Sequence, residues 1–188
     1  MQFDQFDAPD CYQDFDDFKS HWQNYGWYEI PKSAERKVTT DWQTNLETNG
    51  KVEIPTPSRR WDNVSTRAMG ELAEEMEEDF TLSLLTGLRR CTRHGERLLA
   101  IDWQHPWYYF DPHAPITRST RDEWAMPMLP DVDSYNFVAL DFRFGVLTGY
   151  DSRWFVCIFG TELLSAFADE PPKRFLRHFG QGSYTEQA

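Results

Sequence analysis

The sequence predicts an α+β domain with a mostly antiparallel sheet of about five or six strands, one long amphipathic helix and short C-terminal helices. Short apolar runs lie close together in the second half of the chain, and such spacing favours antiparallel neighbours because a parallel crossover needs a dozen or more residues. One helical pattern of apolar residues runs unbroken through the middle of the chain. Aromatic residues make up 16% of the sequence, which argues for a packed core.

The 188 residues are expected to form a single domain, 1–188, with a loose acidic leader at 1–9 and a flexible polar tail at 181–188. A short helix is predicted from Asp10 to Gly26, because an aspartate that can cap a helix precedes aromatic residues at helical spacing. The polar stretch that follows is hard to assign beyond a strand at 27–30.

The clearest helix is predicted over 66–93, with Gly95 as its C-terminal cap. Its apolar residues recur every three or four positions and would face the core. They are Met69, Leu72, Ala73, Met76, Phe80, Leu84 and Leu88. The opposite face is acidic and carries Glu71, Glu74, Glu75, Glu77, Glu78 and Asp79.

The strands are predicted from apolar or aromatic runs bounded by turn residues. They are an edge strand at 58–64 and further strands at 97–103, 107–110, 135–140, 143–148 and 153–159. A helix opening at Thr161 is broken by Pro171 and Pro172, and a last short helix is expected over 173–179.

The charge balance narrows the classes of partner. The net charge of −12 leaves no surplus of lysine and arginine for phosphate neutralisation, so direct nucleic-acid binding is not expected. An anionic membrane surface is disfavoured for the same reason. The first residues are acidic rather than basic and apolar, and three widely spaced cysteines form no CxxC pair; both observations favour a cytoplasmic protein. Another protein with a basic surface is the partner that suits this charge best.

Two histidines and two aspartates lie close together at Asp102, His105, Asp111 and His113. Imidazole and carboxylate are good ligands for a divalent metal, and the same groups are suited to acid–base catalysis. The alternative is that His105 forms local hydrogen bonds and that Asp111 and His113 shape a turn. No other cofactor is predicted, and no nucleophile elbow, P-loop or dinucleotide fingerprint is present.

Two further groups of residues are candidates for binding. Trp103, Trp107 and Trp124 are expected to line a ligand pocket or, as the alternative, to belong to the core. Glu71, Glu74, Glu75 and Glu78 are candidates for a partner-binding surface on the long helix, the alternative being a solvated face.

The N-terminal segment alternates acidic and aromatic residues. Phe3, Phe6, Tyr12, Phe15 and Phe18 are interleaved with Asp4, Asp7, Asp10, Asp14, Asp16 and Asp17. Such a segment either orders as an anchor on binding or frays as a terminus.

Several blocks of the sequence resemble a bacterial family known only as a domain of unknown function. They are DWQHP at 102–106, FDPHAP at 110–115, DFRFG at 141–145 and FG-x-ELL at 159–164, and the resemblance covers about 15–180. Where related sequences often read FGHPW after FRFGV, this chain has Leu147 to Trp154, so no role of that histidine is carried over. The resemblance implies a compact bacterial domain and brings no catalytic residue.

Two functional hypotheses follow. The first is an acidic protein-binding or inhibitory module, such as an immunity-like or anti-defence protein. The second is a small metal-dependent or acid–base enzyme centred on the 102–113 segment.

Overall fold

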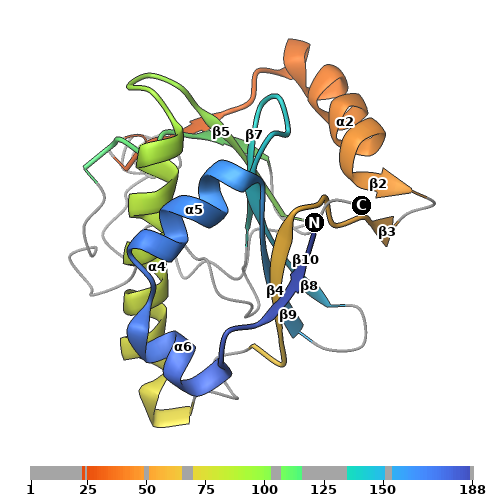
Figure 1. Ribbon diagram of the computed structural model, residues 1–188. Coiled ribbons are helices and arrows are strands. Elements are labelled where there is room, and N and C mark those ends of the chain that lie inside the picture. The colour runs from red at the N-terminus through yellow and green to blue at the C-terminus, as the bar shows by residue number, and fades with distance from the viewer. Residues whose placement is uncertain are drawn as a thin grey trace.

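The computed structural model describes most of the chain (Figure 1). The described residues are 23, 25–48, 51–64, 70–102, 107–115, 135–150 and 154–186. The helix predicted from Asp10 and the leader at 1–9 therefore lie almost wholly outside them.

Ten strands and four α-helices occur in the described part of the chain. The strands are β1 (Trp27–Glu29), β2 (Glu47–Thr48), β3 (Lys51–Val52), β4 (Ser58–Asp62), β5 (Leu98–Ile101), β6 (Tyr108–Phe110), β7 (Asn136–Ala139), β8 (Gly145–Tyr150), β9 (Trp154–Phe159) and β10 (Ser183–Thr185). The helices are α2 (Lys32–Leu46), α4 (Ala73–Cys91), α5 (Thr161–Asp169) and α6 (Lys173–Phe179), and a 3-10 turn over Gly70–Leu72 leads into α4.

Eight strands form one sheet in the order β1-β6-β5-β7-β8-β9-β4-β10, and every neighbouring pair is antiparallel. The predicted α+β class with an antiparallel sheet is confirmed. The predicted number of strands is wrong, because β10 has only three residues without apolar alternation and was not predicted. A separate two-stranded ribbon pairs β2 with β3.

Two positions in the sheet differ from expectation. Strand β4 was predicted at an edge, but it lies between β9 and β10. Residues 183–185 fall in the predicted flexible tail, yet they pair with β4 from Ser183 opposite Arg60 to Thr185 opposite Ser58. The polar tail thus supplies the hydrogen-bonding partner that keeps β4 from being an edge.

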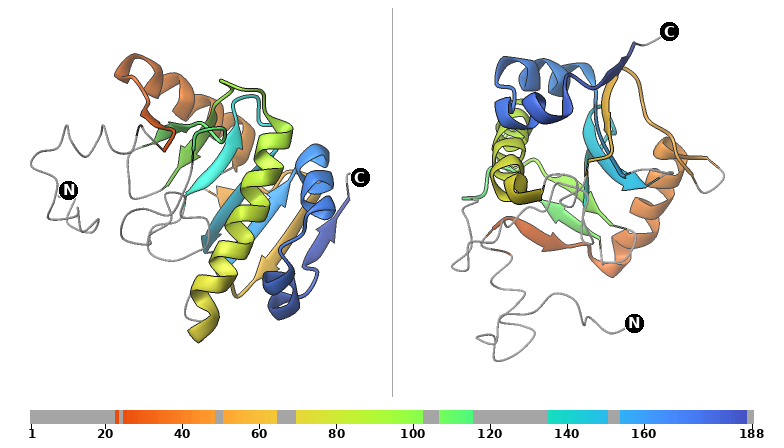
Figure 2. Two further views of the ribbon diagram at one scale, coloured as in Figure 1. Left: turned by 90° about the vertical axis from the view of Figure 1, so that its left-hand side faces the viewer. Right: turned by 90° about the horizontal axis from the view of Figure 1, so that it is seen from below.

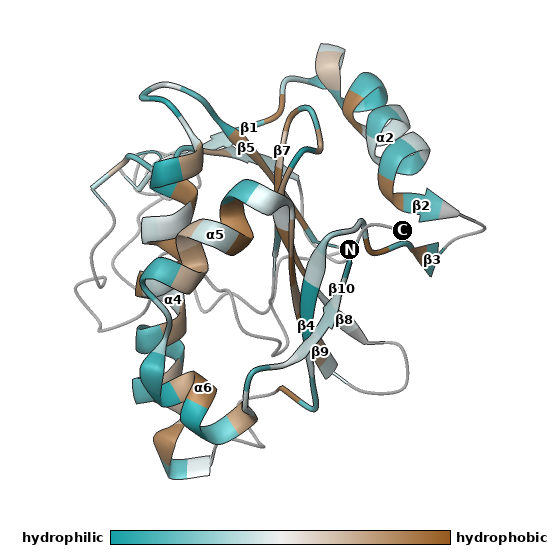
Figure 3. Ribbon diagram, in the orientation of Figure 1, coloured by the Kyte–Doolittle hydropathy of each residue, from teal (hydrophilic) through white to brown (hydrophobic). Residues whose placement is uncertain are grey.

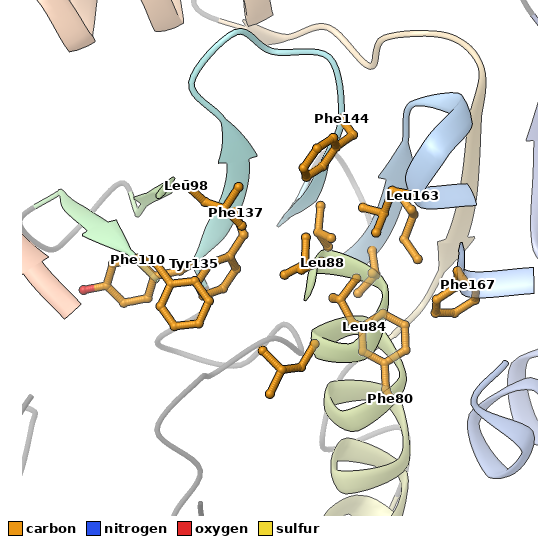
Figure 4. Close-up of a cluster of buried hydrophobic side chains, with 14 of the residues drawn as sticks. Phe80, Leu84, Leu88, Leu98, Phe110, Tyr135, Phe137, Phe144, Leu163 and Phe167 are labelled. Atoms are coloured by element: carbon orange, nitrogen blue, oxygen red, sulfur yellow. The ribbon is translucent and has the colours of Figure 1, made fainter. Parts of the chain in front are cut away.

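Helices α4, α5 and α6 cover one face of the sheet (Figure 1). Phe80, Leu84 and Leu88 repeat every four residues along α4 and point into the core that the helix shares with the strands (Figure 4). Phe137 from β7 and Phe167 from α5 complete this apolar layer. The predicted apolar face of the long helix is confirmed at these positions, although α4 itself begins at Ala73 rather than at 66.

Helix α2 covers the opposite face of the sheet (Figure 2). This 15-residue helix was missed, because only Val38, Trp42 and Leu46 are buried on it and the rest of its surface is mainly hydrophilic (Figure 3). Their spacing of four residues is the signal that identifies it. No helix among the described residues has both the length and the apolar character that a bilayer span requires.

Candidate functional site

Three of the four candidate metal or acid–base residues, Asp102, Asp111 and His113, lie among the described residues. Asp102 is buried at the end of β5, and its carbonyl accepts a hydrogen bond of 2.9 Å from the Trp107 indole. His105 lies outside the described residues, as do Trp103 and Trp124. Trp107 packs against Trp42 with ring centroids 6.3 Å apart and belongs to the α2 core.

His113 is held at the C-terminal end of α4. Its Nε2 lies 3.0 Å from the Thr92 hydroxyl and 3.2 Å from the Thr92 carbonyl oxygen. The Thr92 hydroxyl already donates its hydrogen to the Leu88 carbonyl at 2.7 Å. Both contacts of His113 therefore require Nε2 to carry a proton and donate it, which leaves that nitrogen without a lone pair for a metal.

The FDPHAP block wraps around the same end of α4. The carboxylate of Asp111 accepts the backbone N–H of His113 at 2.8 Å, which closes a local turn. Arg89 donates to the carbonyls of Pro112 at 2.6 Å and Ala114 at 3.0 Å. These bonds support the turn-forming interpretation of Asp111 and His113. Among the residues that the structure describes, no three His, Cys, Asp or Glu side chains are grouped to hold a metal ion.

The DFRFG block makes a second set of contacts at the C-terminal end of α4. Arg143 donates to Asp141 at 2.7 Å, to Glu96 at 2.6 Å and to the Cys91 carbonyl at 3.1 Å, and Glu162 lies 3.7 Å away. The hydrogen bond from Arg143 holds the pKa of Glu96 below its usual range. Arg143 thus ties the β7–β8 turn to the end of α4 and to the start of α5.

The FG-x-ELL block packs against the DFRFG block. Gly160 adopts φ 91° and ψ 131°, a conformation open almost only to glycine, and its N–H donates to the Pro57 carbonyl at 2.9 Å. A Cβ atom at Gly160 would lie 2.4 Å from the Arg143 carbonyl oxygen. Three of the blocks that carry the family resemblance, FDPHAP, DFRFG and FG-x-ELL, therefore meet around one end of α4, where they stabilise the fold.

Neither described cysteine is suited to nucleophilic chemistry. Burial raises the pKa of Cys91 to about 11 and that of Cys157 to about 12. Both thiols stay protonated near neutral pH, and the thiolate is the reactive form.

The N-terminal end of α4 is built differently. Of the predicted partner-binding residues, Glu71 and Glu74 are exposed, and neither makes an ion pair within the described ranges. Glu75 pairs with Arg174 of α6, and Glu78 is half-buried. Asp79 was predicted on the solvated face, but its carboxylate accepts the backbone N–H groups of Arg174 at 2.7 Å and Phe175 at 3.1 Å.

A groove of about 390 Å³ lies between this end of α4 and α6. It is lined by Leu72, Glu75, Met76, Arg174, Arg177 and His178. Leu72 was predicted in the core but is 51% exposed, because it precedes the first turn of α4. Farther along the helix, Leu82 is 45% exposed. The groove was not predicted, although the run of basic residues at 173–178 is visible in the sequence.

The family described as "Protein of unknown function (DUF2716)" matches residues 18–164. The chain belongs to this family. A relative, "Uncharacterized protein YxiI" of Bacillus subtilis (strain 168), is 32% identical over 124 residues, which are 64% of this chain and 76% of that protein. No solved structure matches the chain. The predicted membership of an uncharacterised family is confirmed, and the family brings no activity with it.

Proposed function

We propose that this DUF2716 protein is an acidic protein-binding module that engages a basic surface of another protein through the outer face of α4. Glu75, Glu78 and Leu82 follow one another at intervals of three and four residues and therefore share one face of the helix. Glu71 and Glu74 extend the acidic surface at its N-terminal end. Covering a basic working surface of the partner would make the complex inhibitory.

The observation that carries the proposal is the exposed Leu82 on an acidic helix face. Interfaces combine an apolar centre with a charged rim, and an exposed leucine among carboxylates fits that arrangement. The carboxylates of Glu71 and Glu74 would speed the encounter with a basic surface, and Leu82 would slow dissociation. We place the interaction in the cytoplasm, where Cys91 and Cys157, both unpaired, would remain reduced.

The test begins with gentle purification of the full chain at low salt, followed by native mass spectrometry. We expect a stoichiometric protein partner that dissociates as the salt concentration rises, because the attraction between exposed charges is screened. A partner whose binding is insensitive to salt would contradict the electrostatic part of the proposal. Recovery of the chain alone would contradict the proposal as a whole.

Charge reversal then locates the surface. Glu71→Lys combined with Glu74→Lys should weaken the complex at least about tenfold, since each lost or reversed charge contact changes the binding free energy by about 1 kcal/mol. Glu35→Lys with Glu53→Lys is the matched control, because it changes the net charge equally and Glu35 also lies in the first turn of a helix. Equal weakening by both pairs would show a general charge effect and remove α4 from the interface.

Leu82→Ser tests the apolar centre separately. It should increase the dissociation rate while the association rate changes little, because an apolar contact acts after encounter. Surface plasmon resonance with the recovered partner measures both rates. An unchanged dissociation rate would leave Leu82 outside the interface.

A further inference from the structure

Two buried threonine hydroxyls make no hydrogen bond in the part of the chain that the structure describes. Thr81 of α4 is 0% exposed and Thr148 of β8 is 8% exposed, and the Oγ1 atom of each is buried. Other threonines of α4 behave differently, since Thr86 and Thr92 donate to the carbonyl oxygens four residues earlier. Because burial of an unpaired hydroxyl is unfavourable, these two groups require an explanation.

The register of the sheet places Thr148 in a row with a buried carboxylate. Extending the β5–β7 and β7–β8 pairings by one or two residues puts Asp102, Tyr135 and Thr148 in one row across the three strands. Tyr135 belongs to the core on the α4 side, as do Ala100 and Val146. Since alternate side chains of a strand share a face, Asp102 and Thr148 also point toward α4.

The sheet is locally interrupted beside this row. Strands β7 and β8 pair through two residues each, whereas β8 and β9 pair through six. Past the last β7–β8 pair, the Asn136 amide takes over: its Oδ1 accepts the Thr148 N–H at 2.8 Å, and its Nδ2 donates to the Ile101 carbonyl at 3.0 Å. A side chain thus replaces the backbone ladder and keeps the two strands apart at the level of Thr148.

Helix α4 brings Thr81 over the same row. The rings of Phe80 and Trp61 lie 6.5 Å apart, and Trp61 lies in the row of Thr148, two strands away. Thr81 follows Phe80 and is turned by about 100° around the helix. Thr92, three turns farther along the face of Thr81, contacts the loop that follows β6. Thr81 is therefore turned away from β4, toward the half of the sheet that contains β5 and β6.

Glu77 adds a carboxylate to this face of α4. It was predicted on the solvated face, but it is half-buried and precedes Thr81 by four residues and the fully buried Leu84 by seven. Figure 4 shows Leu84 and Tyr135 on the two walls of the layer. With Asp102, these walls carry two carboxylates, two hydroxyls and an aromatic ring. Carboxylate and hydroxyl oxygens accept hydrogen bonds from an ammonium group, and aromatic rings attract cations.

We propose that a small organic cation with an ammonium group binds between α4 and the sheet, hydrogen-bonded by Thr81 and Thr148 and neutralised by Asp102 and Glu77. Asp102 and Thr148 lie two strand spacings apart, about 10 Å, which suits a molecule with a short carbon chain. The net charge of −12 attracts cations to the protein. The site lies on the buried side of α4, so this proposal and that for the outer face can each fail without the other.

Three four-carbon probes that differ in charge test the ligand class. They are putrescine, a dication, butane-1,4-diol, which is neutral, and succinate, a dianion. In isothermal titration calorimetry of the full chain at low salt, we expect saturable binding of one putrescine and no binding of the diol or of succinate. Absence of putrescine binding, or equal binding of the diol, would overturn the proposal.

Valine substitutions test the two hydroxyls. Thr81→Val combined with Thr148→Val keeps the shape of the side chains, so we expect putrescine to bind at least about tenfold more weakly while the Tm rises by about 2–4 °C. Thr86→Val on the same helix is the matched control and should leave putrescine binding unchanged. A raised Tm without loss of binding in the double variant would show that the hydroxyls are merely unpaired and would overturn the proposal.

A glutamine pair separates the site from general charge attraction. Glu77→Gln should weaken putrescine binding about tenfold, because the lost carboxylate is half-buried beside the ligand. Glu35→Gln is the matched control, since it removes the same charge from an exposed helical position, and it should weaken binding less than about twofold. Equal weakening by the two variants would show that putrescine is held by net charge alone and would overturn the site.

Discussion

The two ends of α4 use charged residues in opposite ways. At the C-terminal end, Arg89, Arg90 and Arg143 each bond to a carbonyl or carboxylate of another element. At the N-terminal end, Glu71 and Glu74 are exposed and make no ion pair in the part of the chain that the structure describes. Three of the family blocks, FDPHAP, DFRFG and FG-x-ELL, form contacts at the C-terminal end, and these contacts stabilise the fold. The second end carries the surfaces for which we propose function.

The acidic end also has a local explanation. Glu74 and Glu75 lie in the first turn of α4, where negative charge interacts favourably with the helix dipole. Helix stability thus accounts for their charge, but it does not account for the exposed Leu72 and Leu82. The function proposed for this end therefore depends on Leu82 as much as on the carboxylates.

The sharpest test of the comparison is a matched pair of glycine substitutions. Gly160→Ala should destabilise the protein by about 4 kcal/mol, because the new Cβ meets the Arg143 carbonyl and the backbone conformation is strained. Gly70→Ala at the other end should cost only about 1 kcal/mol, since its φ is 58° but no atom lies within 4 Å. Urea unfolding followed by circular dichroism measures both. Equal costs would mean that the two ends are not packed differently.

The strands of the sheet show how far the sequence predicts the fold. The apolar runs at 135–140 and 153–159 coincide with β7 and β9. The strand predicted at 143–148 begins at Gly145 instead, because Phe142 adopts φ 60° in a tight turn. Positive φ is rare for phenylalanine, and no sequence pattern predicts it. Strand β10 is missed because it shows no apolar alternation and acquires its pairing from the rest of the sheet.

The candidate site was less predictable, since its contacts join distant parts of the sequence. The acidic residues of the helix are visible as a pattern, but the pairing of Glu75 with Arg174 and the capping of α6 by Asp79 span almost a hundred positions. Hydrophobic periodicity reports which face of a helix is buried, not which later helix its polar side chains meet. His113 was misleading for the same reason, because its partner Thr92 lies on another element.

Two threonine substitutions distinguish the contacts at the C-terminal end of α4 from a hydrogen bond within the helix. Thr92→Val removes the bond to the Leu88 carbonyl and one of the two acceptors of His113, so we expect a loss of about 2 kcal/mol. Thr86→Val removes only the equivalent bond to Leu82 on a more exposed turn and should cost less than about 0.5 kcal/mol. Thermal unfolding of both variants gives the difference. If the two variants lose equal stability, the hydrogen bond from His113 to the Thr92 hydroxyl contributes nothing to the stability of the protein.

The smallest effect is a pH dependence confined to the C-terminal end. Arg143 lowers the pKa of Glu96 in the folded protein, so the contribution of Glu96 to stability is fully present above its unfolded value near 4.5 and is lost as the pH falls through the lowered value. Glu96→Gln should therefore cost at most about 1 kcal/mol at neutral pH and progressively less in acid. Glu96→Gln made in an Arg143→Gln background lacks the partner that lowers this pKa and should converge less with its own parent in urea titrations across this pH range. Parallel curves for both variants would mean that Arg143 does not stabilise the carboxylate form of Glu96, and the two ends of α4 would then differ in packing but not in electrostatics.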